Sequence, residues 1–296
     1  MRKPLVIFFA LLLSLSAVCY YPIISAHSIK AFHGMYTSML MWCPGAAGLL
    51  TKLICDKRLA GLGWKPGNIR YWILALLLPF AYGLTVYGLV WLTGLGGVPN
   101  SGFVNMLQSK YSGLPFYQAL ALYVGYLLTV GLAQNFWRTF GEEIGWRGFL
   151  VPELAKDLGF TKTAWVVGLI WAFWHFPAIL LTDYNIGVAA WCALPCFTVC
   201  VVGISFAMTW LRLKSGSVWP CVILHTVHNM LLQAVLTPMT IDKGITNYFI
   251  DEFGIGTAVA ISLVGFLLWL RQPSVSRSVV LQSDAQDASS LRRDER

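Results

Sequence analysis

The sequence predicts an all-α membrane protein with about eight transmembrane helices that enclose an intramembrane cavity. Three observations indicate this fold class. Hydrophobic residues make up 57% of the 296 residues and charged residues only 11%, whereas about a quarter of the residues are charged in soluble domains. The mean hydropathy is +0.66. Apolar stretches long enough to cross a hydrocarbon core of about 30 Å recur along the whole chain.

Eight stretches satisfy this length criterion. They cover residues 4–26, 31–55, 71–95, 115–140, 163–182, 187–211, 217–237 and 253–271. The first stretch follows Met1-Arg2-Lys3 and so resembles a secretory signal, but its apolar run continues to Ile24 without a good cleavage site. We therefore expect an uncleaved first helix. Residues 1–271 then form one membrane domain, and the polar segment 272–296 is expected to be a disordered cytoplasmic tail.

Basic residues alternate between the connections that join these spans. The two termini and the even-numbered connections carry most of them, namely Arg2, Lys3, Lys57, Arg58, Lys65, Arg70, Lys156, Lys162, Arg212, Lys214, Arg271, Arg277, Arg292, Arg293 and Arg296. Because basic connections are retained on the cytoplasmic side, both termini are predicted to be cytoplasmic, in the plasma or inner membrane if the source is bacterial. The net charge of +8 then reflects topology and does not indicate a nucleic-acid partner.

The first polar motif is Gly141-Glu142-Glu143-Ile144-Gly145-Trp146-Arg147. On a helix Glu143 and Arg147 are four residues apart, which is a favourable spacing for an ion pair. Glu142 points about 100° away from Glu143, so Arg147 cannot easily pair with both carboxylates. The Glu142 carboxylate is therefore free to take part in binding or catalysis. Ionisable groups at membrane depth suggest function. The alternative is an ion pair at a cytoplasmic helix end, with both glutamates solvated.

Glycines at positions 141, 145 and 148 form a stripe roughly opposite that ion pair. Small residues in this pattern let membrane helices approach closely. We therefore expect another helix to pack on this side of the motif.

Two further motifs place polar groups inside later spans. His175 follows the aromatic run Trp171-Ala172-Phe173-Trp174 in the fifth span, and His225 and Asn229 lie four residues apart in the seventh. Such groups are costly in an apolar helix unless they line a hydrated cavity, although hydrogen bonds between helices are the alternative. The expected depths of Glu142, His175 and His225 differ by about 6 Å, so the three could line one cavity open to the cytoplasm or inner leaflet.

The three motifs together resemble the CPBP family of intramembrane endopeptidases, which includes CAAX prenyl endopeptidases and bacterial Abi-type proteins. The resemblance rests on Glu142-Glu143-x3-Arg147, on His175 with its aromatic run, and on His225-x3-Asn229. These motifs lie within about a third of the chain. One departure is Trp171, because the family often has Phe four residues before the second-motif histidine; we expect this position to serve aromatic packing.

The resemblance implies an endopeptidase mechanism. Glu142 and His175 would hold and deprotonate a water molecule, while His225 and Asn229 would donate hydrogen bonds to the developing oxyanion. Glu143 and Arg147 would support the site. The family is commonly described as metallopeptidase, so a divalent metal such as zinc is a further expectation, with candidate ligands Glu142, Glu143, His175 and His225. The sequence has no His-Glu-x-x-His motif, and activation of water without metal is the alternative.

Other functions remain in competition with proteolysis at this point. A non-proteolytic membrane scaffold or regulator with the same fold is one, and a proton-coupled transporter is a weaker one, because the two halves show no repeat of the kind found in many transporters. The sequence lacks the Gly-x-Ser-x-Gly motif of serine hydrolases. The expected partners are the lipid bilayer and a peptide or membrane-protein substrate.

Overall fold

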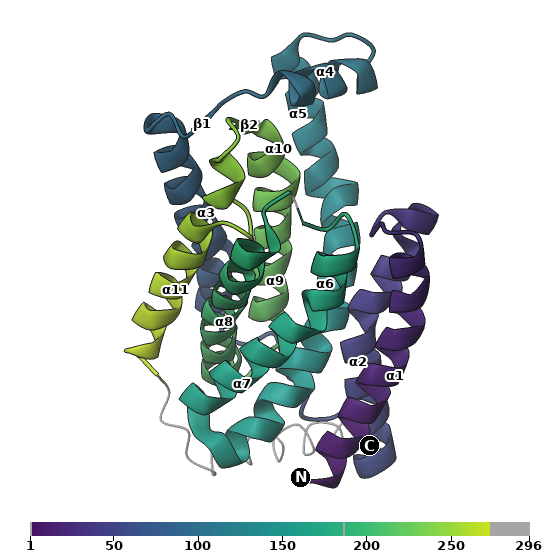
Figure 1. Cartoon of the computed structure of the whole chain (residues 1–296). Helices are drawn as coiled ribbons and strands as arrows, with labels where there is room; N and C mark the ends of the chain where they lie inside the picture. The colour runs from purple at the N-terminus through teal and green to yellow at the C-terminus, as the bar shows by residue number, and fades with distance from the viewer. Residues whose placement is uncertain (1, 186, 273–296) are drawn as a thin grey trace.

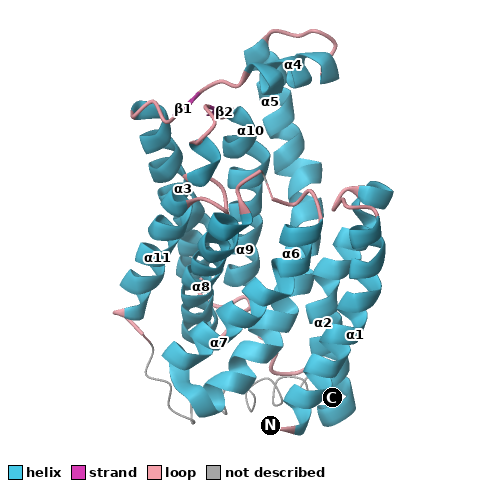
Figure 2. Cartoon of the chain, in the orientation of Figure 1, coloured by secondary structure: helices cyan, strands magenta, loops and turns pink. Residues whose placement is uncertain are grey.

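The predicted all-α class is confirmed by the computed structural model, which describes residues 2–185 and 187–272. Helices make up nearly all of the regular structure (Figure 2). The only strands in the described part of the chain are β1 (Gly96–Gly97) and β2 (Ile241–Asp242), which pair in an antiparallel ribbon between two connections. The predicted disordered tail is the segment 272–296. All of it except Gln272 lies outside the described residues.

The long helices coincide with the predicted spans to within a few residues at most ends. They are α1 (Lys3–Ser25), α2 (Met35–Asp56), α3 (Ile69–Leu92), α5 (Phe116–Tyr126) continued by η2 (Leu127–Gly131) and α6 (Leu132–Glu143), α7 (Val151–Leu181), α8 (Ala190–Ser215), α9 (Trp219–His228) continued by η4 (Asn229–Leu236) and α10 (Thr237–Met239), and α11 (Ile255–Trp269). The short elements between them are η1 (Ala31–Gly34), α4 (Ser101–Lys110), η3 (Ile144–Leu150) and η5 (Thr246–Tyr248).

Six helices among the described residues are long and apolar enough to cross a membrane, judged by length and composition. One of these is a continuous run of 66 residues, Phe116–Leu181, which is interrupted at Gly159, where φ is 67° and ψ is −176°. The apolar helix α11 has 15 residues and is too short for the criterion. Dividing the long run at Gly159 and including α11 would restore eight spans. The polytopic membrane architecture is therefore shown, and the number eight stays a prediction.

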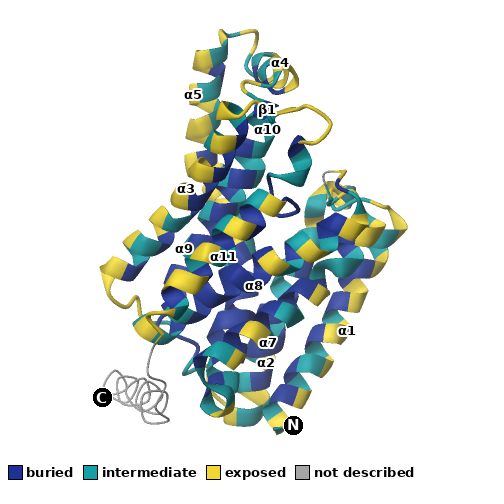
Figure 3. Ribbon diagram, turned by 60° about the vertical axis from the view of Figure 1, so that its left-hand side comes forward, coloured by how far each residue is buried: buried dark blue, intermediate teal, exposed yellow. Residues whose placement is uncertain are grey.

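The helices form one bundle around α8 (Figure 1). Helices α7 and α11 pack directly on α8, α3 packs on α9, and α1 pairs with α2, which in turn packs on α6 and η3. Figure 3 shows buried residues concentrated on α8 and the faces around it, with exposed residues on the outward faces. Many of the outward side chains are large and apolar, including Leu13, Leu84 and Leu263, as expected of helices that face lipid.

Two glycines of the predicted stripe bring the first polar motif against α2. A Cβ atom on Gly145 would lie 2.3 Å from the backbone C and O atoms of Pro44, and one on Gly141 would lie 2.8 Å from the Trp42 ring. No larger side chain fits at either position without moving a helix, so the predicted close approach is confirmed there. The contact fixes the depth and rotation of the segment that carries Glu142 and Glu143.

Candidate functional site

A cavity of about 190 Å³ lies inside the bundle, with walls from α1, α2, α6, α7, α8 and α9. It is large enough to hold several water molecules. The four residues predicted as catalytic, Glu142, His175, His225 and Asn229, all line it. The predicted supporting residues lie behind the wall, where both side chains are fully buried.

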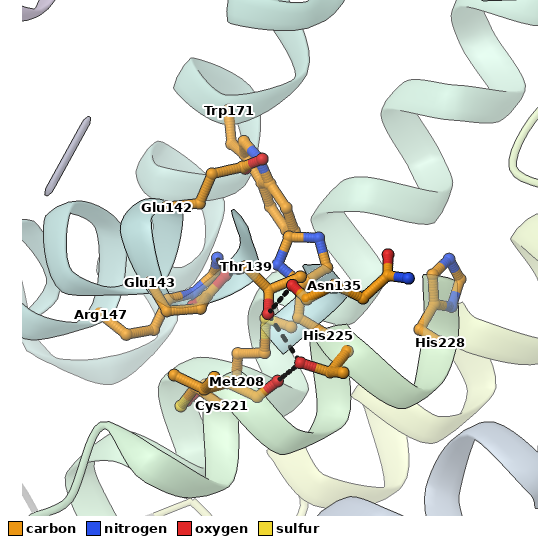
Figure 4. A network of polar contacts seen from close by, with 12 residues as sticks. Asn135, Thr139, Glu142, Glu143, Arg147, Trp171, Met208, Cys221, His225 and His228 are labelled. Carbon is orange, nitrogen blue, oxygen red and sulfur yellow. Dashed lines mark hydrogen bonds and ion pairs between the residues drawn. The ribbon is translucent and has the colours of Figure 1, made fainter. Parts of the chain in front are cut away.

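Glu143 and Arg147 form the predicted ion pair. The distance from Arg147 Nη1 to Glu143 Oε1 is 3.0 Å, and His225 Nδ1 lies 2.9 Å from the same carboxylate oxygen (Figure 4). The guanidinium also stacks on Trp171, with Cζ 4.3 Å from the ring centre. Glu143 therefore holds one catalytic candidate, His225, through a charge that Arg147 compensates. The two adjacent glutamates therefore have different partners, as the helix geometry predicts.

Glu142 is almost fully buried, and it meets a different partner. The indole Nε1 of Trp171 donates a hydrogen bond to Glu142 Oε2 at 2.9 Å. The second carboxylate oxygen, Oε1, makes no hydrogen bond with the described residues. Because Glu142 lines the cavity, that oxygen is available to a water molecule or substrate.

Trp171 stands at the centre of the site. Its ring centre is 6.0 Å from that of His175 and 5.3 Å from that of His225, and both pairs are close to edge-on. From the sequence we expected only aromatic packing at this position. The structure adds the hydrogen bond to Glu142 and the stacking of Arg147. The feature of the sequence that indicates such a bond is the indole N–H, which usually finds an acceptor when it is buried.

The hydrogen-bond partners assign the protons of the two histidines. His175 Nδ1 lies 2.9 Å from the carbonyl oxygen of Trp171, and a carbonyl oxygen only accepts, so Nδ1 carries the proton. His225 Nδ1 likewise donates to the Glu143 carboxylate. In both rings Nε2 is left for the cavity. Asn229 Oδ1 is buried without a hydrogen-bond partner, so the side-chain amide is not committed to the protein interior.

The helix that carries the first motif changes its hydrogen bonding at the site. Segment η3 begins directly after Glu143 and segment η4 begins at Asn229, and both are π-helical. Short π-helical stretches occur frequently at functional sites. A hydrogen bond of 2.7 Å between the hydroxyls of Thr139 and Thr226 joins α6 to α9 just behind the cavity (Figure 4).

The expected metal ligands do not converge as placed. No group of three or more His, Cys, Asp or Glu side chains in the described part of the chain lies at metal-binding separation. Glu143 Oε1 is already occupied by Arg147 and His225. This arrangement does not fit a site with three protein ligands and one open position, so no step of the mechanism below is routed through a metal.

A second polar network lines the same cavity and was not predicted. Glu252, in the connection before α11, accepts hydrogen bonds from the Tyr184 hydroxyl at 2.7 Å and from Gln233 Nε2 at 2.8 Å. Its Oε1 atom lies 3.1 Å from His228 Nε2, and His228 Nδ1 lies 2.7 Å from the Tyr82 hydroxyl. The network ties this connection to α3, α9 and η4.

The carboxylate next to Glu252 belongs to the same connection. Burial and the neighbouring Glu252 charge raise the pKa of Asp251 to about 6. Burial alone would raise the pKa of Glu252, but the hydrogen bonds from His228 and Tyr184 lower it overall. Glu252 is therefore the member of the pair that keeps its charge to lower pH, and it faces the cavity.

The cavity reaches the face of the bundle that carries the odd-numbered connections. Among its described lining residues, Ile29, Tyr184 and Glu252 belong to the first, fifth and seventh connections, and none belongs to an even-numbered connection. On the other side of the bundle, Arg212 donates hydrogen bonds to the carbonyl oxygens of Arg147 and Gly61. The odd-numbered connections lie on the side away from the predicted cytoplasmic termini, so the expected opening toward the cytoplasm or inner leaflet stays a prediction.

Comparison with known proteins finds similarity over the same segment. Residues 123–231, which include all three motifs, match the family described as type II CAAX prenyl endopeptidase Rce1-like. A curated relative, CAAX prenyl protease 2 from Methanococcus maripaludis, is 30% identical over 94 residues. That alignment covers 30% of this chain, and the chain spans about a third, 34%, of the relative's length. Through its central helices, the chain is similar to the CAAX prenyl proteases.

Proposed function

We propose that the protein is an intramembrane endopeptidase of the CAAX type, in which Glu142 and His175 activate the attacking water molecule. One observation carries this proposal. Glu142 on α6, His175 on α7, His225 on α9 and Asn229 at the start of η4 all line a single cavity, and each has a polar atom without a partner in the protein. Ionisable and polar groups gathered at membrane depth are characteristic of a reaction site.

The geometry supports a specific division of labour between Glu142 and His175. Glu142 Oε1 and the unprotonated Nε2 of His175 are both acceptors, so together they can take both hydrogens of one water molecule and leave an oxygen lone pair free to attack. As the water oxygen bonds to the scissile carbonyl carbon, Glu142 accepts the proton as general base. The carbon–nitrogen bond then breaks, and Glu142 returns the proton to the leaving amine.

The opposite side of the cavity would stabilise the oxyanion. Asn229 can donate through its amide nitrogen, and His225 can donate through Nε2 when its ring is protonated. Glu143 favours that protonated ring, because its carboxylate lies 2.9 Å from His225 Nδ1. Donors held in place before the reaction are worth most in a site that excludes bulk water. Glu143 and Arg147 thus act through His225 as positioning residues.

The substrate class follows from the family and the setting. The matched relative is named for a prenylated substrate, and we infer that the substrate here is a peptide or membrane protein that reaches the cavity from the bilayer. The face that delivers it depends on the orientation. With the basic connections in the cytoplasm, the substrate enters from the opposite face; cleavage near the cytoplasmic face requires the inverted orientation.

The decisive test compares matched substitutions in the purified full-length protein. Cleavage of peptides ending in a prenylated cysteine and three further residues is followed by mass spectrometry. Glu142→Gln and His175→Ala are expected to lower kcat by at least about 100-fold without loss of folding. Glu153→Gln, at a partly buried ion pair with Lys156 outside the cavity, serves as the control for the same chemical change. Full cleavage by both cavity variants would remove the proposal.

A cellular test separates proteolysis from a scaffold role. If Glu142→Gln and His175→Ala restore the phenotype that deletion of the protein removes, the chain acts without hydrolysis. Comparative proteomics of membranes containing the wild type or Glu142→Gln would identify substrates that accumulate uncleaved.

A further inference from the structure

Arg138 is the only Lys or Arg among the described residues that line the cavity. It lies on α6, one helical turn before Glu142, so the two side chains project from the same face of the helix with about 6 Å between them along the axis. The side chain is half-buried. The cavity therefore places one permanent positive charge a single turn from the proposed general base.

This guanidinium has few partners in the protein. Its Nε atom donates a hydrogen bond of 3.0 Å to the Ser38 hydroxyl, and no carboxylate of the described residues lies within ion-pair distance of it. Its Nη2 atom lies beside Gly34, where an added Cβ would be 3.9 Å away. Gly34 precedes the first residue of α2, and the start of a helix is the positive end of its dipole. No carboxylate among the described residues forms an ion pair with Arg138, although Glu142 lies one turn further along α6.

The contrast with Arg147 makes this arrangement informative. Arg147 is paired with Glu143 at 3.0 Å and stacked on Trp171, as expected for a cation inside a membrane protein. Charged side chains at this depth normally pair with each other or mark the path of a substrate. Arg138 has no such pair, and its free N–H groups border the space in which we place the substrate.

We propose that Arg138 binds the free C-terminal carboxylate of the peptide substrate and so selects peptides cut close to their C-terminus. The inference rests on the proposed function. The planar guanidinium matches a carboxylate in a two-bond contact. An extended peptide advances about 3.3 Å per residue, so a carboxylate two to three residues beyond the scissile bond lies roughly 7–10 Å from it. The 6 Å axial offset and the length of an arginine side chain cover that range.

A lipid phosphate offers similar anionic oxygens and is the competing source. The two differ in what Arg138 would recognise. A phosphate contact would anchor the helix in the same way for every substrate, whereas a contact with the substrate carboxylate depends on the charge at the end of the peptide.

The experiment uses one prenylated peptide in two forms, with a free C-terminal carboxylate or with a C-terminal amide. kcat/KM is measured for both with the wild type, Arg138→Gln, Arg138→Lys and the control Gln134→Ala, which alters an exposed residue on the same helix. The wild type and the control are expected to prefer the acid by about 10- to 100-fold. Arg138→Gln should lose that preference while it still cleaves the amide. Arg138→Lys should retain part of the preference.

Each outcome decides between the alternatives. If the wild type cleaves neither peptide, the proposed endopeptidase function is wrong. That result is distinct from a failure of the carboxylate proposal, which requires a wild type that cleaves. If the wild type cleaves acid and amide equally, the carboxylate proposal is wrong, whatever the variants do. If Arg138→Gln lowers both rates by the same factor, the preference for the acid is preserved; Arg138 then serves the fold or binds lipid phosphate, and the proposal is overturned.

Discussion

The indole nitrogen of Trp171 donates a hydrogen bond to the carboxylate of Glu142 across 2.9 Å. This bond uses one carboxylate oxygen and leaves the other for the cavity, so Trp171 sets which way the proposed base points. Family members often have Phe at this position, and Phe can supply the ring but not the donor.

The first prediction concerns the loss of the indole donor of Trp171. Trp171→Phe keeps an aromatic ring between the two histidines and removes the hydrogen bond to Glu142. We expect kcat to fall by about tenfold, since a hydrogen bond to a charged group is worth about 1.5–3 kcal/mol. Thermal stability should also fall, because Trp171 is buried and its ring stacks on Arg147. Steady-state kinetics would show the fall in kcat, and Trp165→Phe, at an exposed position of α7, is the control. Unchanged kcat would mean that Trp171 only packs.

The adjacent glutamates should respond in opposite ways to the same substitution. Glu142→Gln removes the proposed base and should leave the fold intact. Glu143→Gln leaves the buried Arg147 without a counter-charge, and breaking such a pair costs about 3–5 kcal/mol. Unfolding monitored in a denaturing detergent should therefore show a large loss of stability for Glu143→Gln alone.

A second substitution checks the cause of that loss. In Glu143→Gln combined with Arg147→Met, the unpaired charge is gone, and much of the stability should return. Activity should not return, because His225 has still lost its partner. Equal stability of the two single glutamine variants would contradict the assigned roles.

The contact between Gly145 and α2 gives a prediction about packing. A Cβ at this position would overlap backbone atoms of Pro44 at 2.3 Å, so Gly145→Ala must push η3 away from α2. Overpacking of this kind costs about 1–3 kcal/mol, which would lower the melting temperature measured in detergent. At Gly125 an added Cβ has nothing within 4 Å, so Gly125→Ala should not destabilise the protein.

The orientation can be measured directly. In a background in which the native cysteines are replaced, Lys110→Cys reports the odd-numbered face and Arg58→Cys the even-numbered one; both positions are exposed. From the distribution of basic residues, we expect a membrane-impermeant maleimide to label Lys110→Cys in intact cells and Arg58→Cys only after permeabilisation. The reverse labelling pattern would mean that the cavity faces the cytoplasm.

The zinc prediction has its own test. Metal content of the purified protein is measured for the wild type and for His175→Ala. A zinc ion held by Glu142, His175 and His225 would be present at one per chain and lost from the variant. The separation of these side chains leads us to expect the same metal content in both proteins.

The helical spans could be predicted from the sequence because apolar length alone decides whether a segment can cross a bilayer. The pairing of Glu143 with Arg147 was also predictable, since both lie on one helix at a fixed spacing. The third partner, His225, comes from a helix about 80 residues later in the chain, and no local rule gives its distance from Glu143. The similar expected depths of the motifs and the resemblance to a family suggested that they meet, but neither gave the contact between Glu143 and His225.

Residues in connections were the hardest to predict. Glu252 reaches the cavity because its connection folds inward and is tied to His228 and Tyr184. Local sequence does not reveal whether a polar connection stays at the surface or folds back into the bundle. The same holds for Arg138, whose position beside Gly34 depends on how α2 packs against α6.

The π-helical stretches after Glu143 and His228 have a consequence for comparing this chain with its relatives. A π-helical turn holds one residue more than an α-helical turn, and each residue of a regular helix turns by about 100°. A relative with a regular helix in place of η4 would have one residue fewer, and an alignment without a gap would displace every later position by one. Deleting one residue from the first half of η4 would convert it toward a regular helix and leave Gln233 facing Glu252, whereas the same deletion within the regular helix α8 would rotate every later residue by about 100°.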